Sequence, residues 1–209
     1  MGWGKNYLKY GVAQNDILKN DVSEADLETY SKAQDKWHCM LKRCYSGDYP
    51  SYIGTFVCES WLIFSNFYKW LLNQPYWKDL ELDKDIVMKG SKVYSPETCA
   101  LVPSYINKSF IIRPPKPGNV HGVFKDSSSK TVKWICQCTI NGVQEYFGRY
   151  HSQEEAHKVW QKIKIQNFQN ILATYQGSSC FDSRVEDRII SAIHTISEDL
   201  LLEKITQTF

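Results

Sequence analysis

The amino-acid sequence predicts a protein of the α+β class, with two folded domains joined by a short linker and followed by a C-terminal helix. Three observations support this prediction. Residues 113–118 hold three prolines and a glycine, which is typical of a semi-stiff linker. Before them apolar residues recur mainly at helical spacing, and after them strand-like segments alternate with turn residues. We therefore expect an extension (1–29), a first domain (30–113), a linker (114–119), a second domain (120–175) and a helix (180–209).

Composition narrows the class of protein. The chain has 209 residues, of which 43% are hydrophobic, so it can bury a core in each domain. It has no apolar run long enough to cross a bilayer and no apolar signal region in its first ten residues, so we expect a cytoplasmic protein without membrane association. Seven cysteines without an export signal predict thiols or metal ligands rather than disulfides.

The first half begins with predicted helices. Ser23 and Asp26 provide a cap and an acidic first turn, and apolar residues then recur at near-helical spacing as far as Arg43, which predicts one helix or two. A second helix is predicted over residues 60–72, ended by Pro75. Its apolar face consists of Trp61, Phe64, Phe67, Trp70 and Leu71.

Residues 82–107 predict two short strands joined by a turn at Gly90 and followed by a helix. Ser95 suits the N-cap, Pro96 the first helical position and Glu97 the positive end of the helix dipole. The helix is expected to reach Asn107.

The amino-acid sequence of this stretch resembles the HNH-type endonuclease family, in the form common in phage genomes. The matching blocks are Asp-Lys-Asp at 83–85, Tyr-Ser-Pro-Glu-Thr-Cys at 94–99 and Asn107, preceded by Trp-His-Cys-Met-Leu-Lys-Arg-Cys-Tyr at 37–45 and Val-Cys-Glu-Ser-Trp at 57–61. Together they span about residues 30–110. The resemblance implies a helical lead-in and a ββα-metal core, and a phage-encoded enzyme that nicks or cleaves double-stranded DNA.

The resemblance also assigns roles to individual residues. Asp83 falls on the metal-binding acid and Asn107 on the helix-borne ligand, which implies Mg²⁺ or Mn²⁺. Lys84 stands where the family has its general-base histidine, and Thr98 where an asparagine orients that histidine. A lysine of ordinary pKa is protonated at neutral pH and accepts no proton, although it can clamp a phosphate. Asp85 is the nearest carboxylate that could replace the base, and ordinary turn chemistry explains Asp83 and Asp85 equally well.

Two functions therefore compete. The first is an active endonuclease with a divalent metal. The second is a catalytically degenerate protein on the same scaffold, which acts as a DNA-binding regulator or as an inhibitor of a host defence complex. Double-stranded DNA is the expected partner, and a host protein complex is the partner of the second alternative.

The cysteines raise the question of a structural zinc ion. Cys44, Cys58 and Cys99 each lie in a block that resembles the family, and His38 or Cys39 could complete a zinc site. The wide spacing, without a Cys-x-x-Cys pair, favours ordinary core packing instead. The alternating pair Cys136 and Cys138 is also expected to pack in the core.

The second domain predicts three strands and a helix. The strands are expected at 120–125, 131–140 and 143–147, with turns at the serines 127–129 and at Asn141-Gly142. Ser152 and Glu155 form a capping box for the helix. Its buried stripe is expected to be Ala156, Val159, Trp160 and Ile163.

Residues 120–173 resemble the APETALA2-type DNA-binding domain, through Gly-Val at 122–123, Lys-Trp at 133–134 and the run from Phe147 to Ala156. The resemblance implies a three-stranded sheet in the major groove. Residues 116–170 carry eight basic and four acidic side chains, which suits a polyanion. The family is usually arginine-rich on this face, whereas here glutamines and a tyrosine take several places. The expected DNA-binding residues are Lys125, Lys130, Lys133, Gln137, Thr139, Gln144, Tyr146 and Arg149.

The C-terminal segment predicts an amphipathic helix over about residues 185–205. Its apolar face consists of Val185, Ile189, Ala192, Ile193, Ile196, Leu200 and Leu201. Such a helix either packs back on the body of the protein or dimerises, and its length of under four heptads favours the first alternative.

Overall fold

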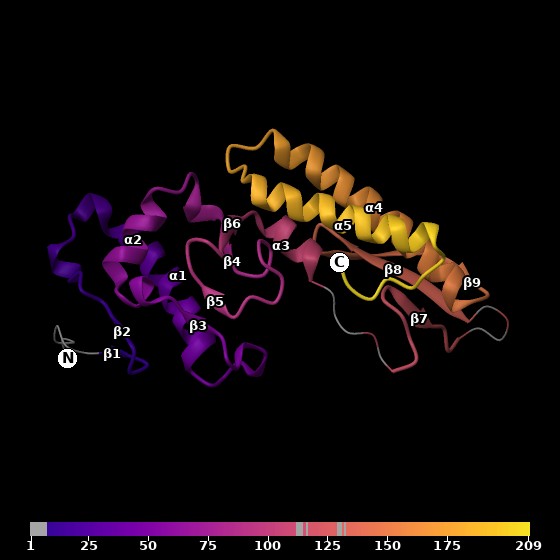
Figure 1. The fold of residues 1–209 in the computed structure, drawn as a ribbon, viewed down its shortest axis with the longest axis horizontal. Helices are drawn as coiled ribbons and strands as arrows, with labels where there is room; N and C mark the ends of the chain where they lie inside the picture. The colour runs from indigo at the N-terminus through magenta and orange to yellow at the C-terminus, as the bar shows by residue number, and fades with distance from the viewer. Residues whose placement is uncertain (1–7, 112–114, 116, 129–130, 132) are drawn as a thin grey trace. The chain divides into compact units, whose positions relative to one another are not determined.

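The structure is a computed structural model that describes residues 8–111, 115, 117–128, 131 and 133–209. The chain divides into two compact units, Met1–Pro103 and Ser104–Phe209, which are described separately below (Figure 1). Both contain helices and small sheets, which confirms the α+β class. The predicted linker at 114–119 follows this division, and residues 114 and 116 of it lie outside the described residues.

Two packed helices form the core of the first unit. They are α1 (Leu27–Tyr45), which follows a 3-10 turn at Glu24–Asp26, and α2 (Phe64–Leu72). Both predicted helical stretches are confirmed, and the first is a single helix. The Trp37 indole is fully buried and donates a 2.6 Å hydrogen bond to the carbonyl oxygen of Trp61. Ahead of the helices lies a small hairpin of β1 (Leu8–Lys9) and β2 (Ala13–Gln14).

The strands of the first unit pair differently from the prediction. β3 (Phe56–Val57) pairs in parallel with β5 (Val93–Tyr94), and β4 (Glu81–Asp83) pairs antiparallel with β6 (Ala100–Val102). The predicted hairpin is therefore wrong, because its two strands belong to different sheets. In the segment between these two strands, the buried Lys84 donates a hydrogen bond to the Ser91 carbonyl.

The helix predicted to begin at Ser95 is also wrong. Ser95 does accept a hydrogen bond from the Thr98 backbone N–H, and Cys99 N–H donates to the Ser95 carbonyl, but the turn stops there. Residues 100–102 are buried and pair with β4. The next helix in the chain, α3 (Ser104–Phe110), begins after Pro103 and belongs to the second unit.

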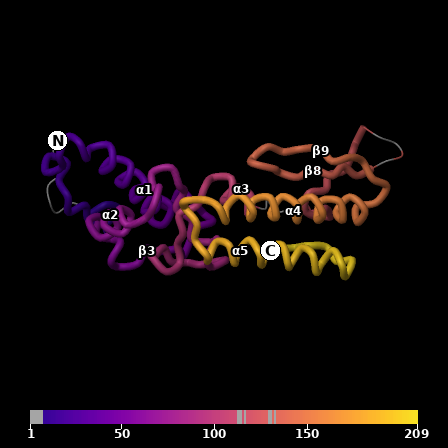
Figure 2. Tube along the Cα trace, turned by 90° about the horizontal axis from the view of Figure 1, so that it is seen from above, coloured from indigo at the N-terminus to yellow at the C-terminus, as the bar shows by residue number. Residues whose placement is uncertain are grey.

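The second unit is built in layers. Its antiparallel sheet has the order β7 (Val123–Lys125), β8 (Trp134–Ile140), β9 (Val143–Tyr150), which confirms the three predicted strands. Figure 2 shows the long helix α4 (Gln153–Gln176) between this sheet and α5 (Ser183–Leu201). The sheet thus has one face against α4 and one face turned away from it.

The start of α4 has the predicted capping residues, Ser152 and Glu155. Ser152 is the N-cap and its hydroxyl accepts a hydrogen bond from Glu155 N–H, while the Glu155 carboxylate accepts one from His151 N–H. Of the predicted stripe, Ala156 and Trp160 are buried, whereas the other two residues are half-buried. Because the helix is covered on two sides, polar residues are buried as well: His157, Gln161, Lys164 and Asn167.

The second covering of α4 comes from α5 and the C-terminal tail at residues 204–209. α5 buries Val185, Ile189, Ala192 and Ile196, so this helix packs on the body of its own unit; dimerisation stays a prediction. In the tail, Phe209 packs against Phe168 at 5.4 Å between ring centroids, edge to face.

Within the described residues, no helix combines the length and apolar character needed to cross a membrane.

Candidate functional site

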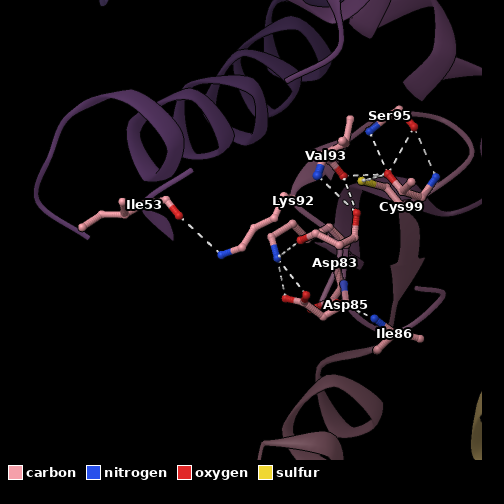
Figure 3. A network of polar contacts seen from close by, with 11 residues as sticks. Ile53, Asp83, Asp85, Ile86, Lys92, Val93, Ser95 and Cys99 are labelled. Atoms are coloured by element: carbon pink, nitrogen blue, oxygen red, sulfur yellow. Dashed lines mark hydrogen bonds and ion pairs between the residues drawn. The ribbon is translucent and has the colours of Figure 1, made fainter. Parts of the chain in front are cut away.

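The Asp-Lys-Asp segment forms a tight turn at the end of β4 (Figure 3). The Asp83 carboxylate accepts hydrogen bonds from the backbone N–H groups of Asp85 at 2.8 Å and Ile86 at 2.7 Å, both on Oδ1. This is the side-chain-to-backbone bonding by which aspartate initiates turns. Burial raises the pKa of Asp83, and the two N–H groups oppose that shift. Asp83 therefore has a structural role here, with one oxygen already engaged.

Lys84 is buried, and its ammonium group has three close acceptors. Nζ lies 2.8 Å from each carboxylate oxygen of Asp85 and 2.8 Å from the carbonyl oxygen of Ser91. An ammonium group has three donors and no acceptor. Lys84 therefore cannot act as a general base, and its ion pair also holds the Asp85 carboxylate, the candidate replacement base.

Thr98 is fixed by a second turn. Its hydroxyl donates to the Val93 carbonyl at 2.7 Å and accepts from the Ser95 backbone N–H at 3.1 Å. Thr98 thus ties the turn to β5 and does not orient the side chain at position 84, whose partners are Asp85 and Ser91.

A divalent metal would have an incomplete donor set in the first unit. Asp83 offers a carboxylate whose Oδ1 already accepts two hydrogen bonds, and Asp85 is paired with Lys84. Asn107, the other predicted ligand, lies half-buried on α3 in the second unit. Among the residues that the structure describes, no three histidine, cysteine, aspartate or glutamate side chains are grouped as a metal site requires.

Of the three candidate zinc ligands, Cys99 is buried, whereas Cys44 and Cys58 are half-buried. Burial raises the pKa of Cys99 to about 12 and the pKa of Cys44 to about 11, so both remain protonated at neutral pH. Cys58 is half-buried, with its sulfur 3.3 Å from the Ser60 hydroxyl. Within the described part of the chain, these three thiols form no metal-binding group with His38 or Cys39, and a zinc site stays a prediction.

The outward face of the β7–β8–β9 sheet gathers four predicted DNA-binding residues. In the register of β8 and β9, Gln137 lies opposite Tyr146 and Thr139 opposite Gln144. Residues opposite one another share a face, so these four form one row, as predicted. Cys136 and Cys138 alternate with them and are buried, which confirms the prediction that they pack in the core.

Basic residues gather at one end of the sheet. Lys125 pairs with Trp134, next to Lys133, and Arg149 pairs with Ile135. All three basic side chains are exposed, although the Arg149 guanidinium also lies 2.8 Å from the carboxylate of Asp126. Hydrogen bonds from Ser128, and to a smaller degree Arg149, hold the pKa of Asp126 below its usual value. Lys130 lies outside the described residues.

β7 presents an outward-facing residue that was not among those predicted from the sequence. Val123 is buried and opposite Cys136, so alternation places Phe124, rather than Lys125, on the same face as Gln137. Phe124 is exposed and lies opposite Ile135. The strand pattern contained this signal, since Val123 is the better candidate for the core.

Comparisons with family models, curated proteins and solved structures find no match to this chain.

Proposed function

We propose that this protein binds double-stranded DNA through the outward face of the β7–β8–β9 sheet, and that its first unit is a catalytically degenerate HNH-like segment. The observation that carries the proposal is the row of Gln137, Thr139, Gln144 and Tyr146 on the sheet face turned away from α4. A β-ribbon fits the major groove, where glutamine pairs bidentately with adenine and threonine contacts the thymine methyl group.

The charge at the end of the sheet supports the same orientation on DNA. Lys133 is an exposed side chain immediately before β8, where it suits a contact with phosphate. Lys125 is exposed as well, but alternation along β7 places it on the other face of the sheet. Phosphate contacts position a protein on the duplex and make its affinity depend on salt, while base contacts specify the sequence. The sheet therefore offers both kinds of contact, with the polar row for reading and the basic end for positioning.

The degenerate character of the first unit rests on Lys84. The antiparallel pair β4–β6, followed in the chain by α3, has the strand–strand–helix order of the ββα-metal nucleases. At the position of the general base, however, Lys84 holds three acceptors, and the neighbouring carboxylate of Asp85 is its ion-pair partner. DNA binding without cleavage is the behaviour of a regulator or of an inhibitor that acts at DNA.

A salt titration tests DNA binding. Affinity for random-sequence duplexes, measured by fluorescence anisotropy, should fall as salt rises. Lys133→Ala should bind every sequence more weakly, with a slope of log K against log salt that is about 0.9 less steep, because one phosphate is no longer neutralised. Lys162→Ala removes the same kind of charge from an exposed position on α4 and should change neither quantity. A slope unaffected by Lys133→Ala would contradict this use of the sheet.

A cleavage assay tests the other half of the proposal. Supercoiled plasmid incubated with the full chain and Mg²⁺ or Mn²⁺ should remain supercoiled, and Asp83→Ala should bind DNA as the unaltered chain does. Nicking that depends on the metal and disappears in Asp83→Ala would refute the degenerate assignment. It would favour an active endonuclease with Asp83 as a metal ligand.

A further inference from the structure

A hydrogen bond joins two glutamines of the polar row. Gln144 Nε2 donates to Gln137 Oε1 at 3.0 Å, across the β8–β9 pair. The two residues are diagonal neighbours, because Gln144 lies opposite Thr139, two residues beyond Gln137. Long side chains at diagonal positions on one face of a sheet come within reach of each other.

The bond gives the two amides different capacities. Adenine in the major groove presents an acceptor, N7, beside a donor, the N6 amino group, so its reader needs an N–H next to a carbonyl oxygen. A glutamine amide has two N–H groups and one carbonyl oxygen. Gln144 can use one N–H for Gln137 and still offer the other N–H together with its oxygen. The Gln137 oxygen accepts this bond with one of its two lone pairs, so its carbonyl is directed at the Gln144 amide.

The exposure of the two side chains also supports different roles for Gln144 and Gln137. Gln144 is exposed on the edge strand β9, two residues after the Asn-Gly turn, whereas Gln137 is half-buried in the central strand β8. The side chain directly opposite Gln144 is Thr139, also exposed, whose methyl group suits apolar contact with a thymine methyl.

Resting on the proposed DNA-binding function, we propose that Gln144 reads the adenine of an A·T base pair, with Thr139 beside it facing the thymine methyl group. Gln137 is a positioning residue that orients the Gln144 amide through their hydrogen bond. A glutamine fixed before binding loses less rotational freedom when it meets its base. The substrate class is thus double-stranded DNA with an A·T pair at the position that faces Gln144.

The test begins with a site selected from a random duplex library by the full chain. The position read by Gln144 is the one whose base preference Gln144→Ala changes. There the unaltered protein should prefer A·T over G·C by roughly 10- to 100-fold, the range of one good bidentate contact. Gln144→Ala should abolish the preference and Gln137→Ala should weaken it. Replacing that adenine by 7-deazaadenine, which lacks N7, should weaken binding of the unaltered chain but not of Gln144→Ala.

The double variant separates positioning from direct reading. If Gln137 acts through Gln144, adding Gln137→Ala to Gln144→Ala should change discrimination no further. Gln137→Glu keeps an acceptor for the Gln144 N–H, so it should keep discrimination while its charge weakens binding to all duplexes. Gln166→Ala is the matched control, because Gln166 makes a similar exposed 3.0 Å amide bond to Asn170 on α4. Circular dichroism melts should be unchanged in every variant.

The outcomes are distinct. An A·T preference that survives Gln144→Ala, or a selected site without an A·T position, overturns the inference while DNA binding stands. Equal effects of Gln137→Ala with and without Gln144 would overturn the positioning role. Absence of any DNA binding by the unaltered chain would instead refute the proposed function itself.

Discussion

Protonation of His157 should loosen the C-terminal tail of the second unit. His157 is fully buried on α4, and both of its ring nitrogens have backbone partners. Nδ1 lies 2.9 Å from the His121 carbonyl oxygen and must donate, while Nε2 accepts the Thr206 N–H at 3.0 Å. A second proton would sit on Nε2 and face the Thr206 N–H, so two donors would oppose each other. The neutral ring is therefore the form that holds the tail.

The pKa of His157 is shifted in the direction that favours the neutral ring. Burial lowers the pKa of His157, as does the neighbouring His121, while the bond to the His121 carbonyl and the charge of Asp199 oppose the shift. The unfolded chain, with a histidine pKa of about 6.5, takes up the proton first as pH falls. Stability contributed by this group is thus complete above about pH 6.5 and declines below it, by up to about 1.4 kcal/mol per pH unit, until the folded-state pKa is reached.

Urea unfolding of the full chain at pH 7.5, 6.5 and 5.5, followed by circular dichroism, measures this loss. The matched protein is His157→Gln, which should be less stable at pH 7.5 but should lose less stability on acidification, and groups common to both proteins cancel in the difference. Burial also lowers the pKa of His38 in the first unit, so both proteins should carry His38→Gln. The protection of the Thr206 amide hydrogen, which is its exchange rate compared with the intrinsic rate at the same pH, should fall below pH 6.5 in the chain that keeps His157. Equal losses of stability in the two proteins between pH 7.5 and 5.5 would refute the reasoning.

Two further substitutions test the packing of each unit. Gly122→Ala should destabilise the second unit by about 3 kcal/mol or more, because the added Cβ would lie 1.9 Å from a Trp160 ring carbon and φ is +74°. Its control is Gly118→Ala, which should cost only about 1 kcal/mol because φ is +80° but the space around the added Cβ is open. Lys84→Ala should lower the stability of the first unit by about 2–3 kcal/mol, because it removes the buried group that donates to the Ser91 carbonyl and pairs with Asp85. Its control is Lys92→Ala at an exposed position, which should change the stability by under about 0.5 kcal/mol. Urea unfolding checks each pair, and equal losses within a pair would contradict these assignments.

Local patterns predicted much of the second unit. The Asn-Gly turn and the capping residues Ser152 and Glu155 act over a few residues, so the sequence shows them directly. The polar row of the sheet was also predictable, because alternation fixes which residues share a face. The polar residues buried on α4 could not be predicted. Their partners, such as the Lys204 carbonyl that accepts from Gln161, lie far along the chain.

The first unit shows where local signals mislead. Ser95, followed by Pro96 and Glu97, is compatible with the start of a helix and with an isolated turn. The isolated turn forms because residues 100–102 pair with β4, which lies earlier in the chain. The buried ion pair of Lys84 is similarly invisible in the sequence. A lysine between two aspartates is typical of a solvated turn, and only the approach of Ser91 shows that this one is enclosed.

The pairing of the four short strands in the first unit has a consequence for how it folds. β3 pairs with β5 and β4 with β6, so the two pairs interleave along the chain and neither encloses the other. Each closure spans a segment that contains a strand of the other pair, which makes the contacts non-local and the folding of this part slow relative to a helical hairpin. During synthesis, α1 and α2 can meet early, but β4 must wait for Val102 to be made. Until then the buried side chains of this region remain exposed, which makes the nascent first unit a candidate for aggregation.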